Sequence, residues 1–142
     1  MNLRERALAS LARREHSRTE LARKLLAHAD AEEINAVLDR LEQEGLLSNA
    51  RFAESLANSR AGRHGSLRLK SELREKGVPE AEAAEVVRLA RQNDLEVARA
   101  VWLKKFGRAP VDAMERAKQY RFLASRGFPS DVVRRVVGGD ED

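Results

Sequence analysis

The sequence predicts an all-α protein, arranged as an elongated array of three tandem three-helix repeats with nine helices in all. The first observation is composition: 42% of the 142 residues are hydrophobic and 35% charged, but only 4% are aromatic. The apolar residues are mainly Ala, Leu and Val and the charged ones include many Arg and Glu, which favours helices over a β-sandwich. The other two observations are apolar side chains at helical spacing along the chain and a string that occurs twice.

Repeat 1, residues 1–47, is predicted to hold three helices. The first runs from Leu3 to Arg14. The second and third are opened by a Ser or Asp that precedes a Glu by three residues, the spacing of a capping box. These two pairs are Ser17–Glu20 and Asp30–Glu33. Gly45 ends the third helix, because glycine takes the positive φ of a helix C-terminus without steric cost.

Repeat 2, residues 48–93, is predicted to hold the next three helices. Ser48 can cap the first of them through its hydroxyl, and glycine or proline bounds the others. The predicted spans are Ser48 to about Arg60, Ser66 to Gly77, and Pro79 to about Ala90. The next residues, Gln92 to Asp94, carry side chains that are common in turns, so we expect a break there.

Repeat 3, residues 94–137, is predicted to hold the last three helices. Their apolar faces continue at helical spacing, with Trp102 on the buried side of the first. The predicted spans are Leu95 to Phe106, about Val111 to Arg126, and a short helix after Pro129. Residues 138–142 are expected to form a frayed acidic tail.

A repeated string supports this division. Leu73-x3-Gly77-Val78-Pro79 recurs 50 residues later as Leu123-x3-Gly127-Phe128-Pro129. Apolar residues follow each glycine at the same three offsets; they are Ala83, Val86 and Val87 in one copy and Val133, Val136 and Val137 in the other. A period near 50 with three helices per copy predicts units that stabilise one another by stacking, as an elongated and slightly curved rod.

Composition and spacing exclude several classes of function. There is no Cys, hence no disulfide framework and no thiolate metal site. The uncharged runs are far shorter than the ~20 residues of a membrane span, and the N-terminus lacks an apolar signal core. We therefore expect a cytoplasmic protein. We also expect a monomer, because no long heptad seam is left over.

Catalytic or metal chemistry is not expected, and no cofactor is predicted. The three histidines, His16, His28 and His64, lie in different predicted helical units or loops, and none pairs with a carboxylate at ligand spacing. The segment from Gly62 to Ser66 lacks the Gly-Lys-Ser/Thr ending and the preceding strand of a phosphate-binding loop.

The charge distribution directs attention to the middle and end of the chain. The net charge of +4 divides into −1 for residues 1–47, +3 for residues 48–93 and +2 for residues 94–142. Two basic clusters are therefore candidates for binding a partner or a nucleic acid. They are Arg60, Arg63, Arg68, Lys70, Arg74 and Lys76 in the first, and Arg116, Lys118, Arg121 and Arg126 in the second.

Two readings of these clusters compete with a plain solvated helix face. Lys70 and Arg74 are four residues apart on one helix, a mildly destabilising like-charge pair that an anionic partner would explain. In the second cluster, Tyr120 lies among the arginines, where an aromatic ring can stack on bases. We expect Tyr120 and Phe122 to be packing residues instead.

Short strings of distinctive residues are spread along the chain. They are LARREHS from Leu11 with Glu20-Leu21, LDRLE from Leu38 with Gly45-Leu46-Leu47, ARFA from Ala50, Glu72-Leu73 with Lys76-Gly77-Val78, KKFG from Lys104, and Arg121-Phe122-Leu123 with Arg126-Gly127-Phe128. In this order they resemble the strings of the RecX family of bacterial regulators of the RecA recombinase. The ordered set, more than any single string, carries the resemblance.

The resemblance implies a nine-helix protein that binds along the groove of the RecA–DNA filament and bridges neighbouring protomers. Such a protein blocks filament extension, promotes disassembly, and suppresses strand exchange, ATP hydrolysis and co-protease activity. Some members of the family also bind single- or double-stranded DNA directly, and none is an enzyme.

Two other functions fit parts of the sequence. A helix-turn-helix protein acting on DNA directly would suit three-helix units and the segment LEQEGLL. Against it, the third helix of repeats 1 and 2 carries several carboxylates on its polar side, which would repel phosphates. The other alternative is a helical scaffold for a different protein, which the residues alone do not separate from a RecA regulator.

Overall fold

The computed structural model describes residues 1–138. The tail expected at 138–142 therefore lies outside the described residues, apart from Gly138, which caps the last helix.

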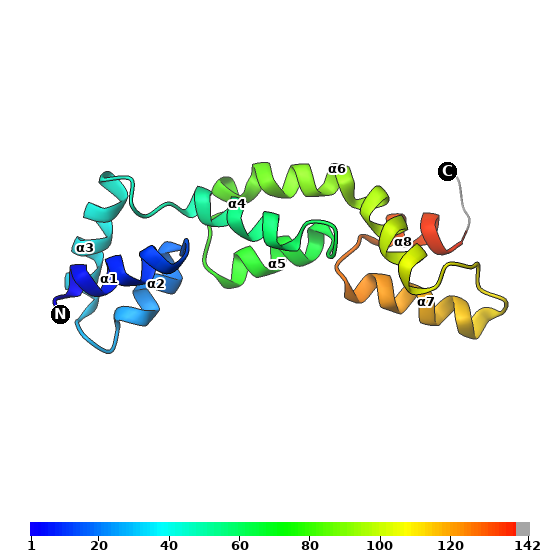
Figure 1. Ribbon diagram of the computed structural model, residues 1–142, viewed down its shortest axis with the longest axis horizontal. Helices are drawn as coiled ribbons and strands as arrows, with labels where there is room; N and C mark the ends of the chain where they lie inside the picture. Colours follow the sequence, from blue (N-terminus) through cyan, green and yellow to red (C-terminus); the bar gives the residue numbers. More distant parts are fainter. Residues whose placement is uncertain (139–142) are drawn as a thin grey trace. The chain divides into compact units, whose positions relative to one another are not determined.

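Within residues 1–138 the chain forms eight helices and no strand (Figure 1). They are α1 (Leu3–Arg13), α2 (Arg18–Leu25), α3 (Ala31–Gln43), α4 (Asn49–Arg60), α5 (Ser66–Glu75), α6 (Glu80–Lys105), α7 (Ala113–Ser125) and α8 (Ser130–Val137). The all-α prediction is confirmed, and the predicted number of nine helices is wrong.

The difference lies in α6, which runs through the turn expected at Gln92 to Asp94. Both turn-forming side chains there bond in ways that are compatible with a helix. The Asn93 Nδ2 donates to the Leu89 carbonyl at 3.1 Å, one helical turn back. Asp94 accepts from Ser66, the first residue of α5. Without a Gly or Pro between Glu80 and Lys105, nothing breaks the backbone ladder, and one 26-residue helix replaces two.

The predicted helix starts are largely confirmed. Ser17 and Glu20 form the complete capping box of α2. Asp30 accepts from the Glu33 N–H at the start of α3, which is one half of the predicted box. The Ser48 hydroxyl accepts from the Arg51 N–H at the start of α4, as expected for a cap.

Three helix ends close in the same way. Gly45, Gly77 and Gly127 have φ values of +76°, +74° and +89°. In each, the N–H of the following residue donates to the carbonyl five positions back; the pairs are Leu46 to Leu41, Val78 to Leu73 and Phe128 to Leu123. These are Schellman closures, so the repeated string corresponds to a repeated backbone conformation.

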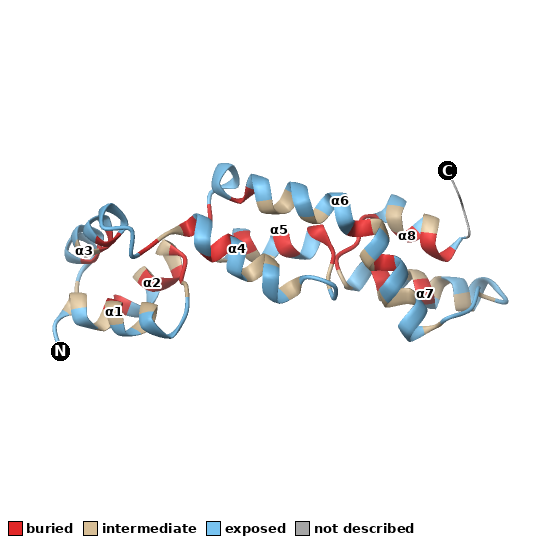
Figure 2. Ribbon diagram, turned by 45° about the horizontal axis from the view of Figure 1, so that its top comes forward, coloured by how far each residue is buried: buried red, intermediate tan, exposed pale blue. Residues whose placement is uncertain are grey.

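The chain divides into two compact units. The first unit comprises residues 1–56 and 73–83. In it, α1, α2 and α3 pack around one apolar cluster (Figure 2). The buried members of this cluster are Ala7, Leu21, Leu25, Ile34, Leu38, Leu41 and Leu47. Burial of each leucine or isoleucine among them stabilises the fold by about 1.5–3 kcal/mol.

The second unit comprises residues 57–72 and the chain from Ala84 on. Its apolar cluster joins α6, α7 and α8, and Figure 2 shows the buried faces of α7 and α8 in red. The buried members are Ala98, Leu123, Phe128, Val133, Val136 and Val137. Trp102 packs against this cluster while staying partly exposed, so the expected core position is partly met.

Candidate partner-binding surface

Two turns of the second unit pack directly against each other and carry cations from both predicted basic clusters. The Gly65 N–H, in the α4–α5 turn, donates to the Arg126 carbonyl at 2.8 Å, and the Leu67 N–H donates to the Gly127 carbonyl at 3.0 Å. A Cβ added to Gly65 would lie 2.4 Å from the Gly127 oxygen, and one on Gly127 would lie 2.4 Å from the Arg68 Cβ. Only glycines permit this approach.

The contact between the turns gathers four arginines around His64. Burial lowers the pKa of His64, and the positive charges of the arginines lower it further. The four are Arg60, Arg63, Arg68 and Arg126. We call these four residues with His64 the arginine cluster. The buried His64 Nδ1 has no hydrogen-bond partner among the described residues, so a polar atom lies inside this group of cations without an interaction of its own. The lowered pKa favours the neutral imidazole.

Glu72 partly neutralises the cluster. Its carboxylate accepts from the Arg60 Nε at 3.0 Å and from the Arg68 Nε at 3.0 Å. Burial alone would raise the pKa of Glu72, but these hydrogen bonds hold it below its ordinary value. Glu72 thus pairs with two of the four guanidinium groups. Arg63 and Arg68 are the exposed members, and within residues 1–138 the Arg63 guanidinium bonds to the Ser59 carbonyl of its own turn.

A buried carboxylate fixes the start of α5 below this surface. Asp94 is 2% exposed and accepts from the Ser66 N–H at 2.9 Å and from the Ser66 hydroxyl. Burial raises the pKa of Asp94, and the hydrogen bonds from Ser66 oppose that shift. Asp94, on α6, therefore caps the N-terminus of α5.

Phe122 is covered by cations and by another ring. The Arg126 guanidinium lies 4.8 Å and the Lys105 ammonium 5.3 Å from its ring centroid. Phe106 meets it edge-on, with the centroids 5.4 Å apart. Tyr120 packs against the apolar cluster together with Phe122. Both rings therefore have packing contacts, which agrees with the packing role expected for them.

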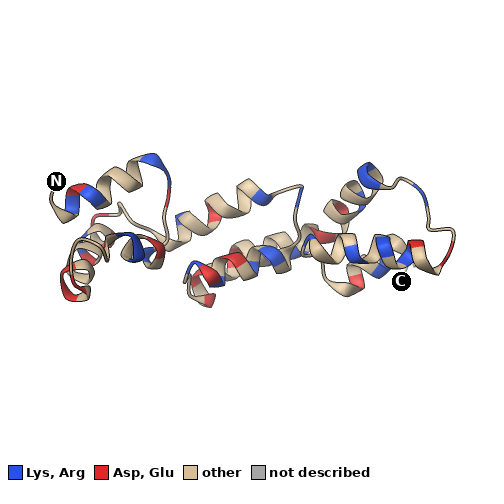
Figure 3. Cartoon of the chain, turned by 90° about the horizontal axis from the view of Figure 1, so that it is seen from below, with Lys and Arg blue, Asp and Glu red and all other residues tan. Residues whose placement is uncertain are grey.

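The remaining candidate cations do not join the arginine cluster through any contact identified in residues 1–138. Lys76 lies in the first unit, with its ammonium 3.7 Å from Glu20. Lys70 is half-buried on α5 and Arg74 is exposed on the same helix. The other three are exposed on α7; they are Arg116, Lys118 and Arg121. Figure 3 shows basic residues interleaved with acidic ones along the helices.

Sequence reasoning missed three members of this surface. The sequence does not single out His64, Glu72 or Lys105 as members of a binding surface. The signal for Lys105 is its position directly before Phe106 in the string KKFG. Within residues 1–138, no three His, Asp or Glu side chains come together as metal ligands would.

Comparison with protein families matches three successive models, described as the first, second and third three-helix domains of RecX. They match residues 4–41, 48–87 and 92–137. The chain belongs to the RecX family. The long helix α6 reconciles three three-helix domains with the eight helices of residues 1–138, because its residues 80–87 fall in the second RecX domain and its residues 92–105 in the third.

Similar proteins span nearly the whole chain. The regulatory protein RecX of Ralstonia pickettii is 48% identical and the match covers 100% of this chain and 90% of the relative. The regulatory protein RecX of Leptothrix cholodnii is 51% identical over 96% of this chain and 88% of the relative. The family is one of regulatory proteins rather than enzymes.

Two solved structures share the fold. A crystal structure of regulatory protein RecX matches with a TM-score of 0.80 at 21% identity, covering 97% of this chain and 72% of the other. RecX from Lactobacillus salivarius matches with a TM-score of 0.81 at 18% identity, covering 96% and 93%. None of the helices within residues 1–138 has the length and apolar character that crossing a membrane demands.

Proposed function

We propose that the chain regulates the RecA recombinase by binding along the groove of the RecA–DNA filament. In this proposal it blocks filament extension, promotes net disassembly, and lowers recombinase, ATPase and co-protease activity. It acts as a monomer in the cytoplasm. The observation that supports the proposal is membership of the RecX family across the full length of the described chain.

ATP hydrolysis by RecA on single-stranded DNA tests this function. We expect substoichiometric amounts of the protein to lower the hydrolysis rate, because one bound molecule at a filament end stops further addition of subunits. An unchanged rate at equimolar protein would contradict the proposal.

We propose the arginine cluster as a contact with the filament. It gathers four arginines around His64, and Glu72 pairs with only two of them, so a net positive charge remains that would complement an anionic partner face. Arg60 and Arg68 are engaged with Glu72, whereas Arg63 is exposed and Arg126 half-exposed. The last two are therefore the residues to alter.

The double variant Arg63→Gln/Arg126→Gln tests this contact. If each lost ion pair contributes up to about 1 kcal/mol, filament binding weakens by roughly five- to thirtyfold. Arg88→Gln/Arg99→Gln removes the same charge from exposed positions of α6 and serves as the control. Co-sedimentation with RecA filaments measures both, and equal weakening in the two variants would refute a specific role for the cluster.

Binding to naked single-stranded DNA at two salt concentrations separates this proposal from direct action on DNA. Filament binding that is tighter and less salt-sensitive than binding to naked DNA supports a regulator of RecA. Strong binding to naked DNA that falls steeply with salt, without preference for filaments, favours the DNA-binding alternative.

A further inference from the structure

The first unit carries a cationic pocket at the ends of two helices. Its volume is about 240 Å³, and it is lined by Ser10, Arg13, Arg14, His16 and Lys24. A single water molecule needs only about 10–15 Å³, so the pocket has room for a polyatomic ligand. No carboxylate lines it.

The buried imidazole of His16 positions the Lys24 ammonium without neutralising its charge. His16 is 2% exposed; its Nδ1 lies 3.0 Å from the Arg14 carbonyl and its Nε2 lies 3.0 Å from the Lys24 Nζ. An ammonium can only donate, so Nε2 accepts and Nδ1 carries the proton. A ring that donates from Nδ1 and accepts at Nε2 is neutral. Burial lowers the pKa of His16 and the charges of Arg14 and Lys24 act in the same direction, against the hydrogen bond to Arg14 and the charge of Glu20. The imidazole therefore supplies no negative charge to offset the Lys24 ammonium.

Within the part of the chain that the structure describes, Glu20 is the carboxylate bonded to this group, and it is already shared. The Arg14 guanidinium donates to both Glu20 oxygens, at 2.9 and 3.1 Å. The Lys76 ammonium lies 3.7 Å from Glu20 as well. Two cations compete for one negative charge there, so Arg13 and Lys24 remain uncompensated by any contact identified in residues 1–138.

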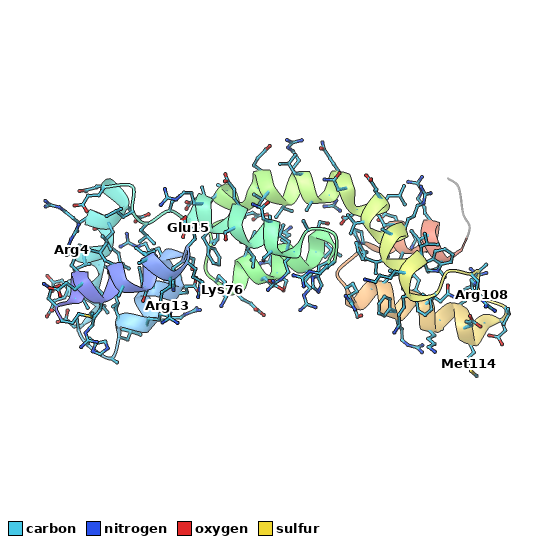
Figure 4. All side chains as sticks on the ribbon, in the orientation of Figure 1. Arg4, Arg13, Glu15, Lys76, Arg108 and Met114 are labelled. Carbon is cyan, nitrogen blue, oxygen red and sulfur yellow. The ribbon has the colours of Figure 1, made fainter. Side chains whose placement is uncertain are left out.

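Helix dipoles explain some of these residues but not their arrangement. Basic residues are common in the last turn of a helix, because they offset the partial negative charge of its carbonyls. Arg13 ends α1 (Figure 4) and Lys24 lies in the last turn of α2. Compensation of the dipole does not require both helix ends to face one pocket. It also does not explain why Lys24 bonds to an imidazole, since a carboxylate would neutralise its charge.

We propose that this pocket binds a phosphate monoester, held by the Lys24 ammonium, the Arg13 guanidinium and the Ser10 hydroxyl. Charge-assisted donors of this kind bind phosphate oxygens strongly. The phosphate can belong to a free mononucleotide or to the terminal phosphate of a nucleic-acid strand. The proposal does not depend on regulation of RecA.

Nuclear magnetic resonance with inorganic phosphate as the probe tests the site. We expect the ring signals of His16 to shift saturably, while those of His28, which is exposed on the same unit, do not. A bound dianion should also raise the pKa of His16, because it stabilises the imidazolium. An absence of any saturable shift at His16 would overturn the proposal.

Lys24→Gln should weaken phosphate binding about tenfold, the effect of losing one charge-assisted hydrogen bond. Arg13→Gln should weaken it similarly. Both residues are exposed, and a glutamine amide can still donate to His16, so we expect both variants to fold, which circular dichroism at 222 nm checks. Lys104→Gln, the same change at an exposed position of α6, is the control. Equal phosphate affinities of the Lys24→Gln and Lys104→Gln variants would refute the pocket as the phosphate-binding site.

Competition then identifies the source of the phosphate. Displacement of inorganic phosphate by AMP indicates a mononucleotide. Displacement by a 5′-phosphorylated oligonucleotide, but not by AMP or the unphosphorylated strand, indicates a strand end. All these measurements omit RecA, so their failure would leave the proposed regulation of RecA untouched, and inactivity toward RecA would leave the pocket untouched.

Discussion

Gly77→Ala is expected to destabilise the first unit through two separable effects. Gly77 has φ +74°, a conformation that costs a residue with a Cβ about 1–2 kcal/mol. A Cβ there would also lie 2.3 Å from the Thr19 Oγ1 and 2.5 Å from the Thr19 Cβ. Such overlap forces a shift that costs about 1–3 kcal/mol. The expected loss of unfolding free energy is therefore roughly 2–5 kcal/mol.

Gly45→Ala is the matched control for the backbone effect. Gly45 has φ +76° and closes α3 with the same hydrogen bonds, but no atom lies within 4 Å of its added Cβ. It should lose only about 1–2 kcal/mol. The difference between the two variants isolates the contact with Thr19. Gly77→Val should lose more unfolding free energy than either alanine variant, because a β-branched residue resists positive φ most strongly.

Urea unfolding followed by circular dichroism at 222 nm measures all three variants. A loss that is equal for Gly77→Ala and Gly45→Ala would refute the role of Thr19. An unchanged unfolding free energy for both would refute the left-handed closure itself, and with it the structural meaning of the repeated string.

Three further predictions concern buried polar side chains. Asp94→Ala should cost about 2–3 kcal/mol, because it leaves the N–H and hydroxyl of Ser66 without their acceptor; urea unfolding measures it, and a loss under about 0.5 kcal/mol would contradict the remote cap. Gln119→Leu should speed hydrogen exchange of the indole N–H of Trp102, the only tryptophan, since Gln119 accepts from it at 2.8 Å; an unchanged exchange rate would show that this bond is not protective. Burial would raise the pKa of Glu20, but its hydrogen bonds lower it below the ordinary 4.5, so the stability that it contributes is present above that value and is lost as the pH falls through the lower, folded pKa. The stability gap between wild type and Glu20→Gln should therefore shrink on acidification, and a gap that is constant from neutral to acidic pH would contradict this.

Local rules predicted much of the fold. Capping residues and glycine closures act within a few residues of chain, so their signals are readable in the sequence. Ser17 forms its box with Glu20, and Gly77 and Gly127 take the same conformation at equivalent places. The division into repeats at the exact boundaries 1–47, 48–93 and 94–137, and the elongation of the array, stay predictions.

The prediction of a helix break at Gln92 to Asp94 is wrong because of a contact between residues that are far apart in the sequence. Asn93 and Asp94 favour turns when their side chains bond to nearby backbone. In the structure Asp94 bonds instead to Ser66, 28 residues earlier. Because Asp94 bonds to Ser66, its side chain does not compete with the helix by bonding to nearby backbone. The sequence of α6 alone does not reveal this contact.

The candidate surface was only half predictable. Neighbours in sequence such as Arg60 and Arg63 were identified together, because charge density along the chain is visible. Their meeting with Arg126 depends on the packing of Gly65 against Gly127. The repeated string assigned Gly127 a role as a helix closure, which it has, but not this second role in which the missing Cβ admits another turn.

The partners of each cation decide which of the predicted residues can serve recognition. Arg60 and Arg68 share the carboxylate of Glu72. Removing either would leave the other in an altered network, so lost activity in such variants would not separate binding from folding. Within the described residues, Arg63 bonds to the Ser59 carbonyl of its own turn, so its loss leaves the Glu72 network intact. A partner that needs the whole cluster should therefore bind the Arg63→Gln variant more weakly, with no change in the unfolding free energy. If the cluster is purely structural, Arg60→Gln should instead lower the unfolding free energy without weakening partner binding.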